Sequence, residues 1–508
     1  MALTRVWGPS LALSATMMAC TGEGSPMSPA DRSADRLWFY ATGLSLAPGD
    51  TARMGVTAAD SAVTTYVTFP DYSGNPWPAD LHIRWWSSDP SRATVDSTGL
   101  VTAHAVGRTT IWVAVGRTID SGRVIVEANP GASGFAAAVT GGGLLHTCGL
   151  STTGQAYCWG SDFNGALGRG QLRQFNSAAT PSPVSGGRQF ASLAVGVDFA
   201  CALTAAGAAY CWGGNQYGEL GDGTDATAFS EIGGFGRAAP VAVLGGKTFT
   251  SVYAGGFHAC ALDAEGQAFC WGWHGLGQLA VGPYEGAGAH RSAPTPAADS
   301  IRFLSLGLGA LHTCGIGTDS ITYCWGLNDK SQLGIDSILS PDRCGGGSVC
   351  STRPIALDSA FRFTAVTAGR AHTCGLTRSG VAYCWGNRSP TPTAVTGPAF
   401  VRITAGTHYT CGLTAAGVAY CWGENDYGQL GDGTRLIDRP DPVAVATAVK
   451  FVRLDAGFDH TCGVAADGWA YCWGSNLKGQ IGDGTMQAPY AVNTAATLSP
   501  ARVRPPLP

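Results

Sequence analysis

A cysteine, nine intervening residues and then Cys-Trp-Gly occur seven times in this chain of 508 residues. The first cysteines of successive copies lie 37 to 60 residues apart, which leaves room for about four short strands per copy. Self-similarity at a period of tens of residues is the signature of a repeat architecture. The sequence therefore predicts an all-β repeat protein in which each copy forms one small sheet.

Each copy reads as a hairpin that brings its two cysteines together. In His372 to Gly386 (HTCGLTRSGVAYCWG), residues 377–380 suit a type I turn with a glycine bulge. Folding about this turn sets Cys374 opposite Cys384, and opposed residues in a hairpin are close enough for a disulfide. The predicted disulfides are Cys148–Cys158, Cys201–Cys211, Cys260–Cys270, Cys314–Cys324, Cys374–Cys384, Cys411–Cys421 and Cys462–Cys472.

A metal site and free thiols are the alternatives to these disulfides. His146, Cys148 and Cys158 could face one side of a hairpin, but zinc takes four ligands and each copy offers three at most. We therefore expect disulfides, and no metal or other cofactor. Cys344 and Cys350 bracket Gly-Gly-Gly-Ser-Val and are predicted to form an eighth bridge. The resulting even count of sixteen paired cysteines suits an oxidising compartment.

The remaining cysteine, Cys20, follows an apolar stretch that begins after Arg5. This segment resembles a bacterial lipoprotein signal, with cleavage before Cys20 and lipidation of its thiol. A plain secretory signal and no signal at all are the alternatives. We expect a signal peptide over 1–20, a flexible tether over 21–34, and a membrane contact through the lipid alone. The predicted location is the bacterial outer membrane or cell surface, and otherwise the periplasm or the medium.

Residues 35–128 change to short alternating runs split by turns, which predicts a β-sandwich. The stretch Trp85 to Val115 (WWSSDPSRATVDSTGLVTAHAVGRTTIWVAV) resembles bacterial immunoglobulin-like group 2 domains. In that family a Trp-x-Ser-Ser turn, an Ala-Thr-Val strand and a Gly-Leu-Val hairpin follow one another in this order. The resemblance implies a spacer or adhesive module on a bacterial surface.

Residues 135–495 carry the copies, each with His-Thr-Cys-Gly-Leu, Tyr-Cys-Trp-Gly, Gly-Gln-Leu-Gly and Pro-x-x-Val or variants of them. As a set, these pieces resemble the repeats of the regulator of chromosome condensation family, which implies a propeller of seven four-stranded blades. Two departures are visible. Eukaryotic members lack the paired cysteines, and the copy after Cys384 omits Gly-Gln-Leu-Gly. We expect residues 489–492 to complete the blade begun at Phe135, leaving a loose tail over 496–508.

Three recurrent motifs allow either a structural or a functional interpretation. The tryptophans of Cys-Trp-Gly could stack on sugars, but packing between blades is favoured because every blade must bury its faces. The histidines that precede the first cysteines are expected to hydrogen-bond within their own blade, rather than to sense pH. Gly-Asp-Gly-Thr at 221–224, 431–434 and 482–485 offers one carboxylate per motif, so it favours a turn over a calcium site.

Two insertions between blades are the candidate binding loops. The longest, 327–354, contains the Cys344/Cys350 staple, with Asp342, Arg343 and Arg353 as candidate contacts. A stapled loop loses less entropy when a partner immobilises it. The second, 225–237, has the candidate contacts Asp225, Phe229, Glu231 and Phe235.

Composition and motifs together favour a binding protein. The net charge is −4, only 13% of residues are charged, and cations are scattered, which argues against nucleic-acid binding. No catalytic motif is recognisable, so we expect a protein that is not an enzyme. The predicted function is a monomeric, exported scaffold for an unknown protein or glycan. The alternatives are guanyl-nucleotide exchange on a small GTPase, as the resemblance implies, and a hydrolase inhibitor or enzyme.

Overall fold

The computed structural model of the chain describes residues 36–40, 43–46, 51–53, 55–60, 63–69, 83–97, 100–105, 107–115, 118–126, 135–139, 145–171, 177–225, 236–387, 389–486 and 497–504. Four residues predicted to have a role lie outside this part of the chain: Cys20, Phe229, Glu231 and Phe235. The chain divides into two compact units, residues 1–126 and 127–508. Each unit is described by itself below.

The first unit is built from strands in three sheets. Their orders are β1-β4-β5, β2-β10-β9-β6 and β3-β8-β7. The strands are β1 (Arg36–Tyr40), β2 (Gly43–Leu46), β3 (Thr51–Arg53), β4 (Gly55–Asp60), β5 (Val63–Phe69), β6 (Ile83–Ser87), β7 (Ala93–Val95), β8 (Leu100–Ala103), β9 (Gly107–Val115) and β10 (Thr118–Val126). Alternation along β9 buries Ile111 and Val113 and places Trp112 against Trp86 of β6, which is the pattern expected of a sandwich strand.

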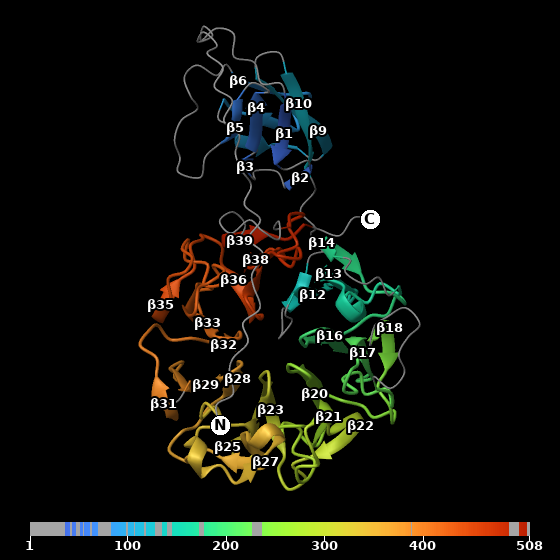
Figure 1. Ribbon diagram of the computed structural model, residues 1–508, viewed down its shortest axis with the longest axis vertical. Helices are drawn as coiled ribbons and strands as arrows, with labels where there is room; N and C mark the ends of the chain where they lie inside the picture. The colour runs from blue at the N-terminus through green and yellow to red at the C-terminus, as the bar shows by residue number, and fades with distance from the viewer. Residues whose placement is uncertain are drawn as a thin grey trace, which may run out of the picture. The chain divides into compact units, whose positions relative to one another are not determined.

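The second unit is a β-propeller of seven sheets, which we number as blades 1 to 7 in chain order (Figure 1). Blade 1 has β11 (Phe135–Val139), β12 (His146–Ser151), β13 (Ala156–Ser161) and β14 (Ser177–Pro183); blade 2 has β15 (Ser192–Val195), β16 (Phe199–Leu203), β17 (Ala209–Gly214) and β18 (Gly236–Ala242); blade 3 has β19 (Ser251–Ala254), β20 (His258–Leu262), β21 (Ala268–Trp273) and β22 (His290–Ala297). Blade 4 has β23 (Phe303–Leu308), β24 (His312–Gly317), β25 (Thr322–Leu327), β26 (Asp342–Arg343) and β27 (Val349–Ala356). Blade 5 has β28 (Ala365–Ala368), β29 (His372–Leu376), β30 (Ala382–Gly386) and β31 (Ser389–Ala394); blade 6 has β32 (Arg402–Ala405), β33 (Tyr409–Leu413), β34 (Ala419–Gly423) and β35 (Arg439–Ala444); blade 7 has β36 (Phe451–Ala456), β37 (His460–Ala465), β38 (Ala470–Gly474) and β39 (Thr497–Arg502). Short 3-10 turns lie at η3 (Phe163–Gly165), η4 (Ser337–Leu339) and η5 (Gly345–Gly347).

The predicted hairpins and their disulfides are confirmed. In blade 5, Cys374 faces Cys384 across β29 and β30, and Gly380 closes the turn at φ 84° by donating to the Thr377 carbonyl. All seven Cys-x9-Cys pairs are bonded, each with Cα atoms 4.1 Å apart. Cys344 and Cys350 form the eighth bridge beside the two-residue strand β26. The seven Cys-x9-Cys bridges each link the second and third strands of one blade.

At six of the seven interfaces between blades, a backbone carbonyl of one blade accepts from the tryptophan of the next, and we call this contact the loop clasp. In blade 4 the segment 331–334 (SQLG) presents the Gln332 carbonyl, which accepts from Trp385 Nε1 (3.1 Å) and Thr373 Oγ1 (2.9 Å) of blade 5. The same carbonyl position accepts from the next tryptophan in five more places: Ala166 from Trp212, Glu219 from Trp271, Gln278 from Trp325, Gln429 from Trp473, and Gln480 from Trp159. The predicted packing of these tryptophans between blades is therefore confirmed.

The histidines bond across blades, so the expectation of bonds within a blade was wrong. His312 Nε2 of blade 4 lies 2.8 Å from Thr373 Oγ1 of blade 5, and the same pairing joins His258 to Thr313, His372 to Thr410, and His460 to Thr147. Successive strand residues point to opposite faces, so a histidine reaches the following blade while the threonine after it reaches the preceding one. Because the Thr373 hydroxyl donates to the loop clasp, His312 must donate from Nε2.

Ring closure also differs from the prediction. β39 pairs with β38 and completes blade 7, whereas blade 1 is built entirely from β11 to β14. The strand lies beyond the predicted boundary at residue 495, and Val503 after it is buried in blade 7, so this part of the chain is not a loose tail. Residues 489–492 lie outside the described residues. Blades 1 and 7 lie side by side (Figure 1) and meet through the Phe135 N–H, which donates to the Gly468 carbonyl, and through the Trp159–Gln480 clasp.

Candidate functional site

The connections between the third and fourth strands, which are long in every blade except blade 5, lie on one face of the propeller. Strands run antiparallel within each blade, so the connection between the first and second strands is at the same end as the one between the third and fourth. The two connections touch: the Gly214 N–H donates to the Asp198 carbonyl in blade 2, and the Trp273 N–H to the Phe257 carbonyl in blade 3. We call this side the long-loop face.

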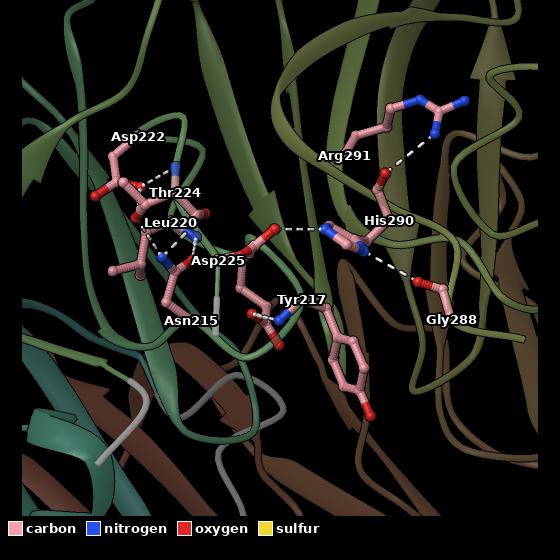
Figure 2. A network of polar contacts seen from close by, with 10 residues as sticks. Asn215, Tyr217, Leu220, Asp222, Thr224, Asp225, Gly288, His290 and Arg291 are labelled. Atoms are coloured by element: carbon pink, nitrogen blue, oxygen red, sulfur yellow. Dashed lines mark hydrogen bonds and ion pairs between the residues drawn. The ribbon is translucent and has the colours of Figure 1, made fainter. Parts of the chain in front are cut away.

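The predicted turn at Gly-Asp-Gly-Thr is confirmed in blade 2. Asp222 Oδ1 accepts from the Thr224 N–H (3.0 Å), and Asn215 Oδ1 accepts from the Leu220 N–H (3.0 Å) (Figure 2). Asn215 Nδ2 then donates to Thr224 Oγ1 (2.9 Å), which ties both ends of the loop together. Blades 6 and 7 repeat the arrangement around Asn425 and Asn476. The aspartate therefore orders the loop by hydrogen bonds, in agreement with the turn interpretation.

Asp225, the first residue of the predicted loop 225–237, contacts the neighbouring blade. Its Oδ2 lies 2.9 Å from His290 Nε2 at the start of β22 (Figure 2). The adjacent Arg291 forms a two-pronged ion pair with Glu285 (2.7 and 2.9 Å). Hydrogen bonds from Arg291 lower the pKa of the Glu285 carboxyl. The loops of blades 2 and 3 are thus joined by the Asp225–His290 contact, with the Arg291–Glu285 ion pair next to it in sequence.

The stapled loop of blade 4 packs on the other side of the blade 3 loop. The Gly345 N–H donates to the Gly275 carbonyl (3.3 Å), and the Cys344–Cys350 bridge packs with Leu276 and Leu327. Of the predicted contacts, Asp342 has a structural role, because Oδ2 accepts from Thr352 N–H (2.8 Å) and Thr352 Oγ1 (2.9 Å). Arg343 and Arg353 are exposed. Residues 215–225, 274–290 and 328–349 therefore form one continuous region, which we call the three-loop surface.

Sequence reasoning missed two apolar features of this surface. Ile338 and Leu339, on the turn η4, are 75% and 70% exposed, and the Asp336 carboxylate fixes the turn by accepting from the Ile338 N–H. The sequence contains a signal for this feature, because Ile338 and Leu339 stand between polar residues in the longest insertion. The second feature is a half-buried aromatic cluster of Tyr217 and Trp273, whose ring centroids are 5.7 Å apart, together with Phe257.

A pair of carboxyl groups, the buried Glu219 and the half-buried Asp198, lies beneath the blade 2 loop and was also missed. Burial raises the pKa of Asp198, which accepts from Asn164 Nδ2 of blade 1 (2.8 Å). Burial, helped by the nearby Asp198 charge, raises the pKa of Glu219 to about 8. The signal was present in the sequence, since Glu219 replaces the glutamine of Gly-Gln-Leu-Gly.

On the long-loop face, hydrogen bonds link the turns between the first and second strands of blades 2 to 7. Main-chain bonds pass from blade to blade: Val197 to Gly256, Gly256 to Gly309, Ala310 to Gly369, Arg370 to Thr407, and Thr407 to Phe458. A cavity of about 160 Å³ lies among these turns and is lined by Arg370 and Asp455. Burial raises the pKa of Asp455 to about 7. These main-chain bonds tie the turns of six neighbouring blades to one another beside the long loops.

Within the described ranges, no three His, Cys, Asp or Glu side chains are grouped so that they could hold a metal ion. Nor does any described helix combine the length and apolarity needed to cross a bilayer.

Comparison with known proteins identifies both units. Residues 74–126 match the family described as Bacterial Ig-like domain (group 2). The second unit matches two families described as Regulator of chromosome condensation (RCC1) repeat, one over 153–203, 206–262 and 416–464. The other matches 138–166, 190–219, 249–278, 363–389, 400–429 and 451–480. The propeller is built from RCC1 repeats. A bacterial immunoglobulin-like domain precedes it.

Relatives and solved structures agree with an RCC1 propeller. The chain is 28% identical over 365 residues to the ultraviolet-B receptor UVR8 of Arabidopsis thaliana, covering 71% of this chain and 68% of that protein. It is 25% identical to the human E3 ubiquitin-protein ligase HERC2 over 70% of this chain, but spans 6% of that protein. The structure of human WBSCR16 is 19% identical with a TM-score of 0.58, covering 75% and 99% of the two chains. Prp20p of Saccharomyces cerevisiae is 22% identical with a TM-score of 0.54, covering 65% and 83%. These structural matches establish the fold.

Proposed function

We propose that this chain is an exported bacterial surface protein that binds a protein or glycan partner through the three-loop surface, without catalysis. In this proposal a lipid on Cys20 anchors the chain, and the disulfide-bonded RCC1 propeller is the binding scaffold. RCC1 propellers are protein-binding platforms. The immunoglobulin-like domain and the eight disulfides support a location outside the cytoplasm, where such bridges persist.

The exposed Ile338 and Leu339 carry the proposal. Large apolar side chains at a loop tip have an unfavourable contact with water that a partner would relieve. The loop that presents them is held by the Cys344–Cys350 bridge and by its contact with Gly275. Arg343 donates to the Ser340 carbonyl (3.4 Å), so it places a charge beside the apolar tip, as the polar rim of a protein interface does.

The test compares two surface variants in captures from envelope fractions and on glycan arrays. Ile338→Ser with Leu339→Ser should lower capture of any specific ligand at least tenfold, because an apolar anchor is lost. Leu436→Ser with Ile437→Ser is the matched control, since these side chains are also exposed on the long-loop face but in blade 6. Equal retention of ligand by both variants, or no specific ligand at all, would contradict the proposed surface.

The proposed anchor is tested separately by the intact mass of chain isolated from its native envelope. We expect cleavage before Cys20, a mass increase of a diacyl or triacyl group, and loss of that group in Cys20→Ser. An unmodified mature mass that begins elsewhere would contradict the anchor and leave the binding surface unaffected.

A further inference from the structure

Blade 5 lacks the segment that forms the loop clasp in every other blade. Its third strand ends at Gly386 and its fourth begins at Ser389, whereas blade 6 has residues 424–438 between the same two strands. The 37-residue spacing between Cys374 and Cys411 reflects this deletion. Trp422 and Thr410 of blade 6 therefore face an interface from which the usual loop is missing.

Two hydrogen-bond donors are left without their usual acceptor. In blades 1, 4, 5 and 7 the threonine and the tryptophan both donate to one loop carbonyl of the preceding blade. Thr461 and Trp473 of blade 7, for example, both donate to the Gln429 carbonyl of blade 6 (3.0 Å each). Thr410 Oγ1 lies 2.9 Å from His372 Nε2, and either atom can be the donor, depending on the histidine tautomer. Among the described residues, the other hydrogen-bond contact of this hydroxyl group is with the Cys374 sulfur, 3.5 Å away and weak. No described residue accepts from Trp422 Nε1.

A cleft of about 290 Å³ occupies the place of the missing loop. Its lining includes Trp422, Thr410, Val395 and Cys384. Trp422 retains 7% of its surface, while the six clasped tryptophans of the other blades retain at most 1%. Cys384 is half-buried, whereas the other cysteines of the Cys-x9-Cys pairs are fully buried. The cleft is therefore open to solvent and exposes groups that the other blades seal.

We propose that this cleft binds a turn of another protein that has the form Gly-x-Leu-Gly, in place of the loop that blade 5 lacks. The six filled positions in the same propeller define the ligand. Each supplies a carbonyl to the tryptophan and a leucine or isoleucine that becomes fully buried: Leu167, Leu220, Leu279, Leu333, Leu430 and Ile481.

The last residue of the turn must be small and have a positive φ: it is glycine in five blades and Ala280 (φ 52°) in blade 3. A Cβ on Gly431 would lie 2.6 Å from Trp473 Nε1, so a side chain there would collide with the indole, and Gly431 also has φ 67°. A partner turn that lies flat on Trp422 should therefore have glycine, or at most alanine, at the same position. The ligand is thus an exposed glycine-rich turn with a single leucine. A charged side chain at the position of this leucine would prevent binding, because the charge would be buried without a partner.

The experiment titrates the oxidised full-length chain with the peptide DYGQLGDGT, the sequence of residues 426–434, by calorimetry. We expect one site per chain and at least tenfold weaker binding of the control peptide DYGQDGDGT. Trp422→Phe keeps the ring but removes the indole donor, and should weaken binding about fivefold. Trp112→Phe, in the first unit, should leave binding unchanged. The peptide should also slow reduction of Cys374–Cys384 by dithiothreitol.

A grafted loop provides a second test that does not depend on peptide affinity. Replacing residue 388 with residues 424–438 of blade 6 should fill the cleft, abolish peptide binding and raise the melting temperature. Absence of peptide binding to the folded chain, or binding that persists in the graft and in Trp422→Phe, would overturn the proposal. Ile338 and Leu339 lie in blade 4, so neither result bears on the proposed binding by the three-loop surface.

Discussion

At the scale of single residues, the repeats show which side chains depart from the common pattern and what each departure costs. Glu219 is the clearest case, because glutamine stands at the same place in blades 3, 4, 6 and 7. Glu219 Oε2 accepts from the Tyr217 N–H (2.7 Å), as Gln429 Oε1 does from the Tyr427 N–H (2.8 Å). A neutral carboxyl group can replace the amide in this bond, whereas a buried carboxylate is destabilising.

The first prediction concerns the pH dependence that Glu219 introduces. Folding raises its pKa from 4.5 to about 8, so the folded state holds the extra proton between these values. The stability is therefore unaffected by Glu219 below about pH 4.5, falls as the pH rises, and is lowest above pH 8. Glu219→Gln should be more stable than the parent at pH 9 by a few kcal/mol, and nearly equal at pH 4.5. Denaturant unfolding at both pH values measures the difference.

Gln429→Glu is the reciprocal control for this prediction. It places a carboxyl group at the equivalent buried position of blade 6, so it should lower stability at pH 9 more than at pH 4.5. If neither variant changes the pH dependence of unfolding, the buried acid at this position is already compensated by its surroundings.

At the scale of strands and loops, sequence reasoning succeeded where the deciding contacts are local. Cys374 and Cys384 are joined by one turn, so their spacing fixes the register and hence the bridge. The two candidate loops were also recognised, but their approach to the blade 3 loop depends on packing between blades. The same limit explains His312, whose partner Thr373 is 61 residues away. The 37-residue spacing revealed a missing segment, but not the cleft that its absence opens.

The second prediction concerns the staple of the blade 4 loop. Cys344→Ser with Cys350→Ser should leave the melting temperature of the propeller nearly unchanged, because this bridge constrains a loop at the edge of one blade. Proteolysis within residues 328–349 should become at least several-fold faster, since the loop gains conformational freedom. Limited digestion followed by mass spectrometry locates the cuts.

Removal of a bridge within a blade is the comparison for the staple variant. Cys411→Ala with Cys421→Ala opens a loop between β33 and β34 and should cost about 3 kcal/mol. If the staple variant costs as much, the blade 4 loop contributes to the core of the propeller and is not an independent element.

At the scale of the whole propeller, blades 1 and 7 close the ring by ordinary packing between complete sheets. Phe135 and Trp159 of blade 1 lie in one apolar cluster with Val464 and Ile481 of blade 7. Pro-x-x-Val recurs in the sequence without revealing which blade receives the last strand, so the order of closure could not be predicted. We call the interface between blades 7 and 1 the seam. Thr147 makes the same contacts there, with a histidine and with a loop carbonyl, that threonines make at other interfaces between blades.

The third prediction is that the seam is as strong as an internal interface. Thr147→Val removes hydrogen bonds to His460 and Gln480, and Thr373→Val removes those to His312 and Gln332. Each should cost about 1–3 kcal/mol, because a buried histidine N–H and a buried carbonyl lose their partners. Urea unfolding under oxidising conditions compares them. A much larger effect of Thr147→Val would show that the ring depends specifically on its seam.

The placement of the bridges has a consequence for biogenesis. For every bonded cysteine, the native partner is also the nearest cysteine along the chain, ten or six positions away. Closing a short loop costs less entropy than closing a long one, so random encounter already favours the correct pair. A polypeptide threaded into an oxidising compartment from its N-terminus could finish one crosslink before the next thiols emerge. Assembly would then proceed hairpin by hairpin, with little need for an isomerase to reshuffle mistakes.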